Sequence, residues 1–155
     1  MIIETLKSLY KRDLEKLKEE IGLYRDEGTI WKIDGEITNS AGNLCLHLIG
    51  NLNAFIGAEL GNSGYVRQRD IEFSTRETPR DELLKKIDKT TQIVADSLDR
   101  LSNEQLEEDY PLVVFAGKKM STGYFIIHLA THLNYHLGQI NYHRRIFDAA
   151  LSDAE

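Results

Sequence analysis

Four of the five histidines of this chain fall close together near its C-terminus. If this stretch is helical, successive residues advance about 100° around its axis. Four imidazoles then share one side of the helix with Gln139, at His128, His132, His136 and His143. Leucine and isoleucine residues continue that side, so the histidines border the face that a helical bundle would bury. Burying an unpaired imidazole costs free energy, which either a hydrogen-bond network or a metal ion would offset.

His132 and His136 are four residues apart, so a helix brings both imidazoles within reach of one ion. A third ligand must come from another segment, and His47 is the only histidine elsewhere in the sequence. Three histidines leave coordination positions open for water or substrate, as in catalytic metal sites. Neutral imidazole suits zinc, nickel, iron or copper, so the ligand type does not choose the metal. Spacing alone still favours hydrogen-bonded core histidines over metal ligands.

The residues beside these three histidines have more than one role open to them. His128 would be a fourth ligand, a partner behind a ligand or a structural histidine, and we favour the last two because a fourth ligand would reduce the open positions. Gln139 would bond a ligand or a bound water, or else an adjacent helix. Tyr135 would line a pocket, although aromatic packing is favoured. We expect His143 to be structural or on the surface, and Gly138 to allow close helix packing.

No acidic residue is built into the histidine pair. Metalloproteases of the HExxH class carry a glutamate after the first histidine as general base, and Leu133 occupies that position here. A base would have to come from elsewhere, and Asp70 and Glu72 are the candidates. They lie among arginines, so a surface loop of ion pairs is the favoured interpretation. Asn51, four residues after His47, would face the site or bond another helix.

Four amphipathic segments must position these residues, and in each of them apolar side chains recur at steps of three and four. Residues that favour a helix N-terminus precede three of the segments: Asn39 or Ser40, Thr78 with Pro79, and Ser121 or Thr122. We predict helices over residues 2–24, 40–60, 79–101 and 122–147. Long loops should follow the first three, over 29–38, over 65–77, and at 110–119 as a short hairpin or an extended crossover. The pattern predicts one domain, residues 1–155, folded as an all-α four-helix bundle.

The composition limits the classes of function. The 155 residues fit one domain, 41% of them are hydrophobic, and the net charge is −6 without a dense basic patch, which argues against nucleic-acid binding. The N-terminus lacks the apolar core of a signal peptide, and no apolar run approaches membrane-spanning length. Cys45 is the only cysteine and cannot form an intramolecular disulfide. We therefore expect a cytoplasmic protein with no membrane partner.

The sequence HLNYHLGQ at 132–139 is similar to the HxxxHxGQ signature in the last bundle helix of the DinB/YfiT-like superfamily. His47, within LCLHLIGN, matches the first ligand of that superfamily on helix two. Segment 67–73, RQRDIEF, also resembles an uncharacterised bacterial branch with an RxRDxEF loop. The resemblance covers nearly the whole chain, including a tryptophan-bearing loop before helix two.

The resemblance implies a four-helix bundle, usually a homodimer, whose metal is held by His47, His132 and His136. Zinc or nickel is the expected ion, with iron or manganese as alternatives. Characterised relatives include S-transferases and isomerases that use low-molecular-weight thiols, and metal-dependent hydrolases. We therefore expect a metal-dependent enzyme that acts on a small molecule by thiol transfer or hydrolysis. The alternative is a non-catalytic, stress-associated dimer that binds a metal or a small ligand.

Overall fold

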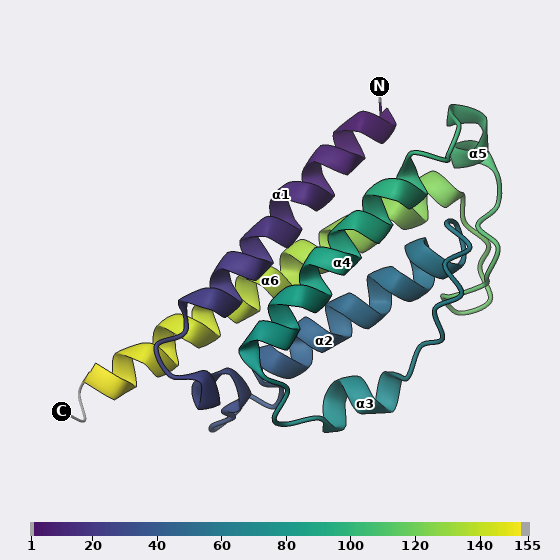
Figure 1. The fold of residues 1–155 in the computed structure, drawn as a ribbon. Coiled ribbons are helices and arrows are strands. Elements are labelled where there is room, and N and C mark those ends of the chain that lie inside the picture. The colour runs from purple at the N-terminus through teal and green to yellow at the C-terminus, as the bar shows by residue number, and fades with distance from the viewer. Residues whose placement is uncertain (1, 153–155) are drawn as a thin grey trace.

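Figure 1 shows the fold as a computed structural model, which describes residues 2–152. Four long helices lie along one another: α1 (Ile2–Leu23), α2 (Ala41–Leu52), α4 (Arg80–Leu98) and α6 (Thr122–Ser152). Short helices occupy the connections: η1 (Glu27–Trp31), η2 (Asn53–Ala58), α3 (Arg69–Ser74) and α5 (Asn103–Glu107). The described residues contain β-structure only as isolated bridges. The predicted all-α four-helix bundle is therefore confirmed.

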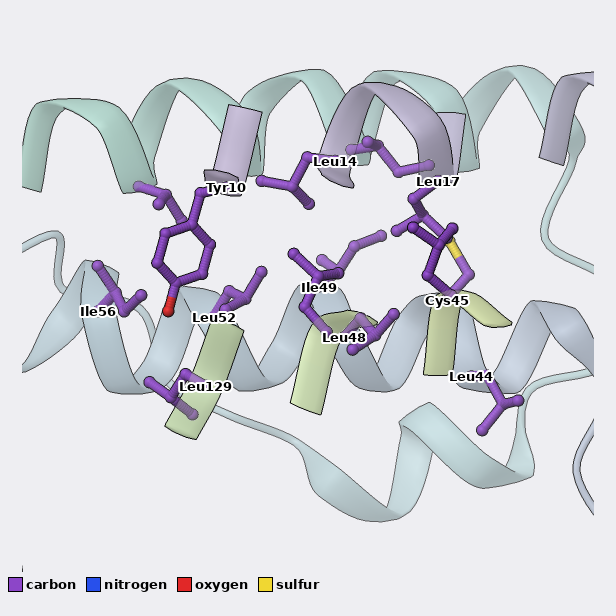
Figure 2. Packing of buried hydrophobic residues seen from close by; sticks show 14 of the residues in the cluster. Tyr10, Leu14, Leu17, Leu44, Cys45, Leu48, Ile49, Leu52, Ile56 and Leu129 are labelled. Carbon is purple, nitrogen blue, oxygen red and sulfur yellow. The ribbon is translucent and has the colours of Figure 1, made fainter. Parts of the chain in front are cut away.

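The bundle is held together by the apolar faces of its long helices. α1 packs against α4 and α6, and α2 packs against α3, α4 and α6. Figure 2 shows side chains that fill the space between them, among them Tyr10, Leu14, Leu17, Leu48, Leu52 and Leu129. The hydroxyl of Tyr10 donates to the main-chain oxygen of Ile126 at 2.7 Å. This bond satisfies the one polar group of a fully buried ring.

The helix starts follow the capping signals of the sequence. The side chain of Ser40, not Asn39, accepts from the main-chain nitrogen of Asn43 at 3.1 Å and caps α2. Pro79, not Thr78, occupies the cap position of α4 and makes no side-chain cap bond, and acidic residues fill the first turn of that helix. The main-chain nitrogen of Tyr124 bonds the Ser121 hydroxyl at 3.2 Å at the start of α6.

The second predicted helix changes its winding before its predicted end. α2 is α-helical to Leu52 and continues as the π-helix η2, Asn53–Ala58. The side-chain Nδ2 of Asn53 donates to the main-chain oxygen of Ile49 and to the hydroxyl of Thr90, both at 2.8 Å. A side chain that enters the main-chain ladder in this way widens the helix locally.

Two predicted loops contain more structure than expected, since residues 65–77 include the helix α3 and the start of 29–38 is part of η1. Between the third predicted helix and the loop at 110–119, α5 begins at a capping box between Ser102 and Gln105. At 110–119 the hairpin alternative is the one observed, since Phe115 and Lys118 form an antiparallel bridge around a turn with positive φ angles. The last helix runs to Ser152 and not to Phe147. Among the described helices, none is long and apolar enough to cross a membrane.

Candidate metal centre

Three histidines from two helices converge at one edge of the core. His132 Nε2 lies 3.3 Å from His47 Nε2 and 3.1 Å from His136 Nε2. One ring nitrogen from each histidine can be chosen so that all three lie within 4.8 Å of one another. His47 is buried, and the other two are half-buried. The structure thus places His47 beside the pair on α6, although 85 residues separate it from His132.

The helix packing accounts for this convergence. The α2–η2 segment runs antiparallel to α6, since the Phe55 ring contacts Phe125 while the His47 ring contacts His132. Leucines one position along each helix, Leu48 and Leu133, are fully buried in the core. Because about 100° separates successive side chains, the histidines lie at the border of that core. They remain within reach of solvent on one side.

The surroundings of His132 and His136 favour the neutral forms of these two rings. Burial lowers the pKa of His132 from 6.5 to about 4, with added repulsion from His136 and His47. Burial also lowers the pKa of His136, against the opposing effect of its hydrogen bond to Gln139. Neutral imidazole is the form that binds a metal ion, since protonation occupies the lone pair. At neutral pH, therefore, these two side chains are largely unprotonated and need not release a proton to bind a cation.

The donor set fits a divalent transition metal with open positions. Two imidazoles that bind one ion at about 2.0–2.1 Å in tetrahedral geometry hold their nitrogens about 3.3 Å apart. The two Nε2 separations at His132, 3.1 and 3.3 Å, are close to that spacing. Three neutral nitrogen ligands suit zinc, nickel, iron or copper. The three histidines could therefore hold a metal ion, whose identity the donor set leaves open.

Glu72 lies behind His47, which corrects the prediction of a surface ion-pair loop. It is 5% exposed, and its Oε2 lies 3.1 Å from His47 Nδ1. Arg67 donates two hydrogen bonds to the same carboxylate, from Nε to Oε1 at 2.7 Å and from Nη2 to Oε2 at 2.8 Å. Asp70, the other acidic candidate, is exposed on α3. The helical turn of α3 directs Glu72 inward and Asp70 outward. A prediction of a loop cannot distinguish the two.

A glycine makes room for this carboxylate. A Cβ atom added to Gly50 of α2 would lie 1.9 Å from Glu72 Oε1. Burial would raise the pKa of Glu72, but hydrogen bonds with His47 and Arg67 outweigh it and hold the pKa below its usual value. The carboxylate is charged and fully engaged, so it is not a free general base. An isolated glycine in an apolar helix was the one sequence signal for this contact.

The other predicted neighbours occupy different positions around the centre. Gln139 Oε1 lies 2.6 Å from His136 Nδ1, which is a bond to one of the three histidines. His128 stacks 6.4 Å from the ring of His132 and lies outside the three-nitrogen group. Tyr135 is 65% exposed, with its ring 5.2 Å from that of His136.

Two polar atoms near the centre have no partner among residues 2–152. They are Oδ1 of Asn51 and Nδ1 of His132, and both are buried. Asn51 follows His47 by one helical turn on α2. A histidine that binds an ion through Nε2 carries its proton on Nδ1 and needs an acceptor there.

His143 and Gly138 lie away from the centre. Tyr24 OH lies 2.7 Å from His143 Nδ1, and His143 Nε2 donates to the main-chain oxygen of Lys32 at 2.8 Å. Of the two roles that we considered for His143, structural or on the surface, the structure shows the structural one. The residue joins α6 to the end of α1. A Cβ at Gly138 would meet nothing within 4 Å, so the prediction of close helix packing at this glycine is wrong within the chain.

A pocket of about 310 Å³ lies between α6 and the segment that leads into α2, with His143 in its wall. Gln139, which bonds His136, is part of its wall, and Leu44 lies one turn before His47. Apolar side chains supply much of the remainder, from Ile37, Tyr142 and Ile146. A volume of this size admits a small molecule.

A family model described as "Protein of unknown function (DUF1572)" matches residues 2–151. The chain belongs to this family. The DUF1572 match spans all four long helices, so the family corresponds to the whole bundle and includes all three histidines of the cluster. None of the curated proteins with which the sequence was compared matches it.

Proposed function

We propose that this DUF1572 protein is a DinB/YfiT-like metal-dependent enzyme whose divalent ion is held by His47, His132 and His136. The observation that carries the proposal is the convergence of three histidine ring nitrogens, with two of their separations suited to one shared ion. Within the described residues, the cluster contains no carboxylate or thiolate, so positions on the ion stay open for a reactant. Zinc or nickel is the ion we expect.

The reaction that the site suits best is transfer to or from a low-molecular-weight thiol. A bound ion lowers the pKa of a thiol or water in an open position. A thiol has an unperturbed pKa of about 8.5, against about 15.7 for water, so it needs far less help to ionise. Glu72 is engaged by His47 and Arg67 and is not available as a base. The absence of a free carboxylate at the cluster therefore favours a thiol over hydrolytic water.

A metal assay on untagged protein tests the proposal. We expect about one equivalent of zinc or nickel in the wild type and a loss of most of it in His47→Ala and in His132→Ala. His143→Ala serves as the matched control, because this histidine lies outside the cluster, and it should retain the metal. Equal, negligible metal in the wild type and all variants would overturn the proposed site.

An activity assay separates the enzyme from a non-catalytic metal-binding bundle. The loaded protein is offered a small electrophile with bacillithiol, mycothiol or glutathione. We expect turnover with one of these thiols and its loss in His132→Ala. Metal binding without turnover with any of them would instead favour the non-catalytic alternative.

We also infer that a second copy of the chain covers one face of α6. Exposed apolar side chains follow one stripe of this helix: Tyr124, Ile127, Tyr135, Tyr142 and Ile146. Gly138 lies in the same stripe with open space above it, which would admit the close approach of another helix. Such a stripe is typical of an interface between subunits.

A further inference from the structure

His47 Nδ1 has two neighbours with opposite demands. Glu72 Oε2 lies 3.1 Å away and, as a carboxylate oxygen, can only accept a hydrogen bond. Arg67 Nη2 lies 3.2 Å away and can only donate one. A neutral imidazole carries one proton, so Nδ1 either donates to Glu72 or accepts from Arg67. The two contacts therefore favour opposite tautomers of the same ring.

The tautomer decides whether His47 can serve the cluster. Its other nitrogen, Nε2, faces His132 Nε2 at 3.3 Å. When the proton is on Nδ1, the lone pair of Nε2 is free for an ion. When Arg67 donates to Nδ1, the proton is on Nε2 and points into the cluster. Glu72 thus favours the form that binds an ion, and Arg67 favours the form that cannot.

Arg67 is bound by the same carboxylate that faces His47. The guanidinium makes two short bonds to the carboxylate, at 2.7 and 2.8 Å, and lies 5.6 Å above the ring of Phe55. Both partners are largely buried, so these charge-assisted bonds are little weakened by solvent. The carboxylate itself occupies the space left by the missing side chain of Gly50. Its position is thus fixed from the side of α2 as well as from Arg67.

We propose that Glu72 is a positioning residue that holds His47 in the tautomer with Nε2 free, and that it also keeps Arg67 from imposing the other one. This inference rests on the proposed metal site. Loss of Glu72 would do more than remove an acceptor, because it would leave Arg67 as the one hydrogen-bonding neighbour of Nδ1 among the described residues. The competing donor is what distinguishes this arrangement from an ordinary carboxylate behind a metal ligand.

Zn²⁺ affinity measured by competition with a chromophoric chelator tests the metal side of the inference. We expect Glu72→Ala to bind Zn²⁺ about 10–100-fold more weakly than the wild type. Asp70→Ala removes the same charge from the exposed face of α3 and should stay within about twofold. The double variant Arg67→Ala/Glu72→Ala should bind several-fold more tightly than Glu72→Ala, because the competing donor is gone. Equal affinities of Glu72→Ala and Asp70→Ala, or of the single and double variants, would contradict the inference.

Long-range ¹H–¹⁵N NMR spectra of the metal-free protein read the tautomer directly. We expect the proton of His47 on Nδ1 in the wild type and on Nε2 in Glu72→Ala. Glu72→Gln fills the same space above Gly50 and can still accept through its oxygen, so it should keep the wild-type tautomer. It is the variant to compare with the wild type if Glu72→Ala proves unstable. A proton on Nε2 in the wild type would overturn the inference. Failure of the wild type to bind Zn²⁺ would instead overturn the proposed function and leave the spectra to judge the tautomer.

Discussion

At the scale of single residues, the four histidines of α6 have different surroundings although their spacing makes them look alike. Both ring nitrogens of His143 are hydrogen bonded, one of them to Tyr24. His132 instead has Nε2 facing His47 and an Nδ1 atom without a partner among the described residues. Partners, and not position along the helix, therefore separate a structural histidine from one that can bind an ion.

The surroundings of His132 also predict how the metal-free protein responds to acid. Its pKa is lowered from 6.5 to about 4, chiefly by burial. Between these values the unfolded chain binds more protons than the folded chain. The stability that comes from keeping the ring neutral is therefore complete above about pH 6.5 and is lost as the pH falls towards 4. We expect the free energy of unfolding, measured with denaturant in EDTA, to decrease across that window.

His132→Asn is the comparison for this prediction, since it removes one titrating group and keeps a polar side chain of similar size. Its free energy of unfolding should decrease less steeply between pH 6.5 and 4 than that of the wild type. The buried His143, whose pKa is lowered by burial, contributes to the slope in both proteins. Identical slopes would show that His132 does not titrate in the way that its burial implies.

At the scale of elements, the long helices could be predicted because local signals specify them. Ser40 and Pro79 mark helix starts, and the apolar periodicity extends over several turns. The six-residue helix α3 could not be predicted in this way, since a helix so short is not stable by itself. It contacts α2 through Glu72, whose carboxylate lies over Gly50. The contact behind His47 could not be predicted for the same reason. The resemblance did indicate the three histidines, with His132 and His136 in HLNYHLGQ and His47 in LCLHLIGN.

Substitution of Gly50 by alanine tests whether this contact holds α3 in place. Alanine favours a helix by about 1 kcal/mol over glycine, but its Cβ would lie 1.9 Å from Glu72 Oε1. We expect the carboxylate to be displaced and hydrogen exchange at residues 69–74 to become about tenfold faster or more. Exchange in the core of α1 and α4 should change little, because those helices do not depend on α3.

Gly22→Ala is the matched control, because a Cβ at this glycine of α1 would meet nothing within 4 Å. It should leave exchange in α3 unchanged and should not destabilise the protein. Unaltered exchange at 69–74 in Gly50→Ala would mean that α3 is held by contacts other than Glu72.

At the scale of the whole molecule, the histidine cluster and the exposed stripe of α6 are neighbours. Tyr135 belongs to the stripe, and its ring lies 5.2 Å from that of His136. Tyr142 belongs to the stripe and also to the wall of the 310 Å³ pocket. A second copy packed on this face would therefore border the open side of the cluster and shield it from bulk water.

Light scattering after gel filtration tests this arrangement. We expect the wild type to have twice the mass of the 17.7 kDa chain. Tyr142→Glu places a charge in the stripe, at a residue 67% exposed in the single chain, and should yield monomers because burying an unpaired carboxylate is costly. Lys85→Glu, which changes an exposed residue of α4 on another face, should leave the dimer intact. A wild type with the mass of one chain would contradict the proposed dimer. The cluster would then face solvent, as it does in the single chain.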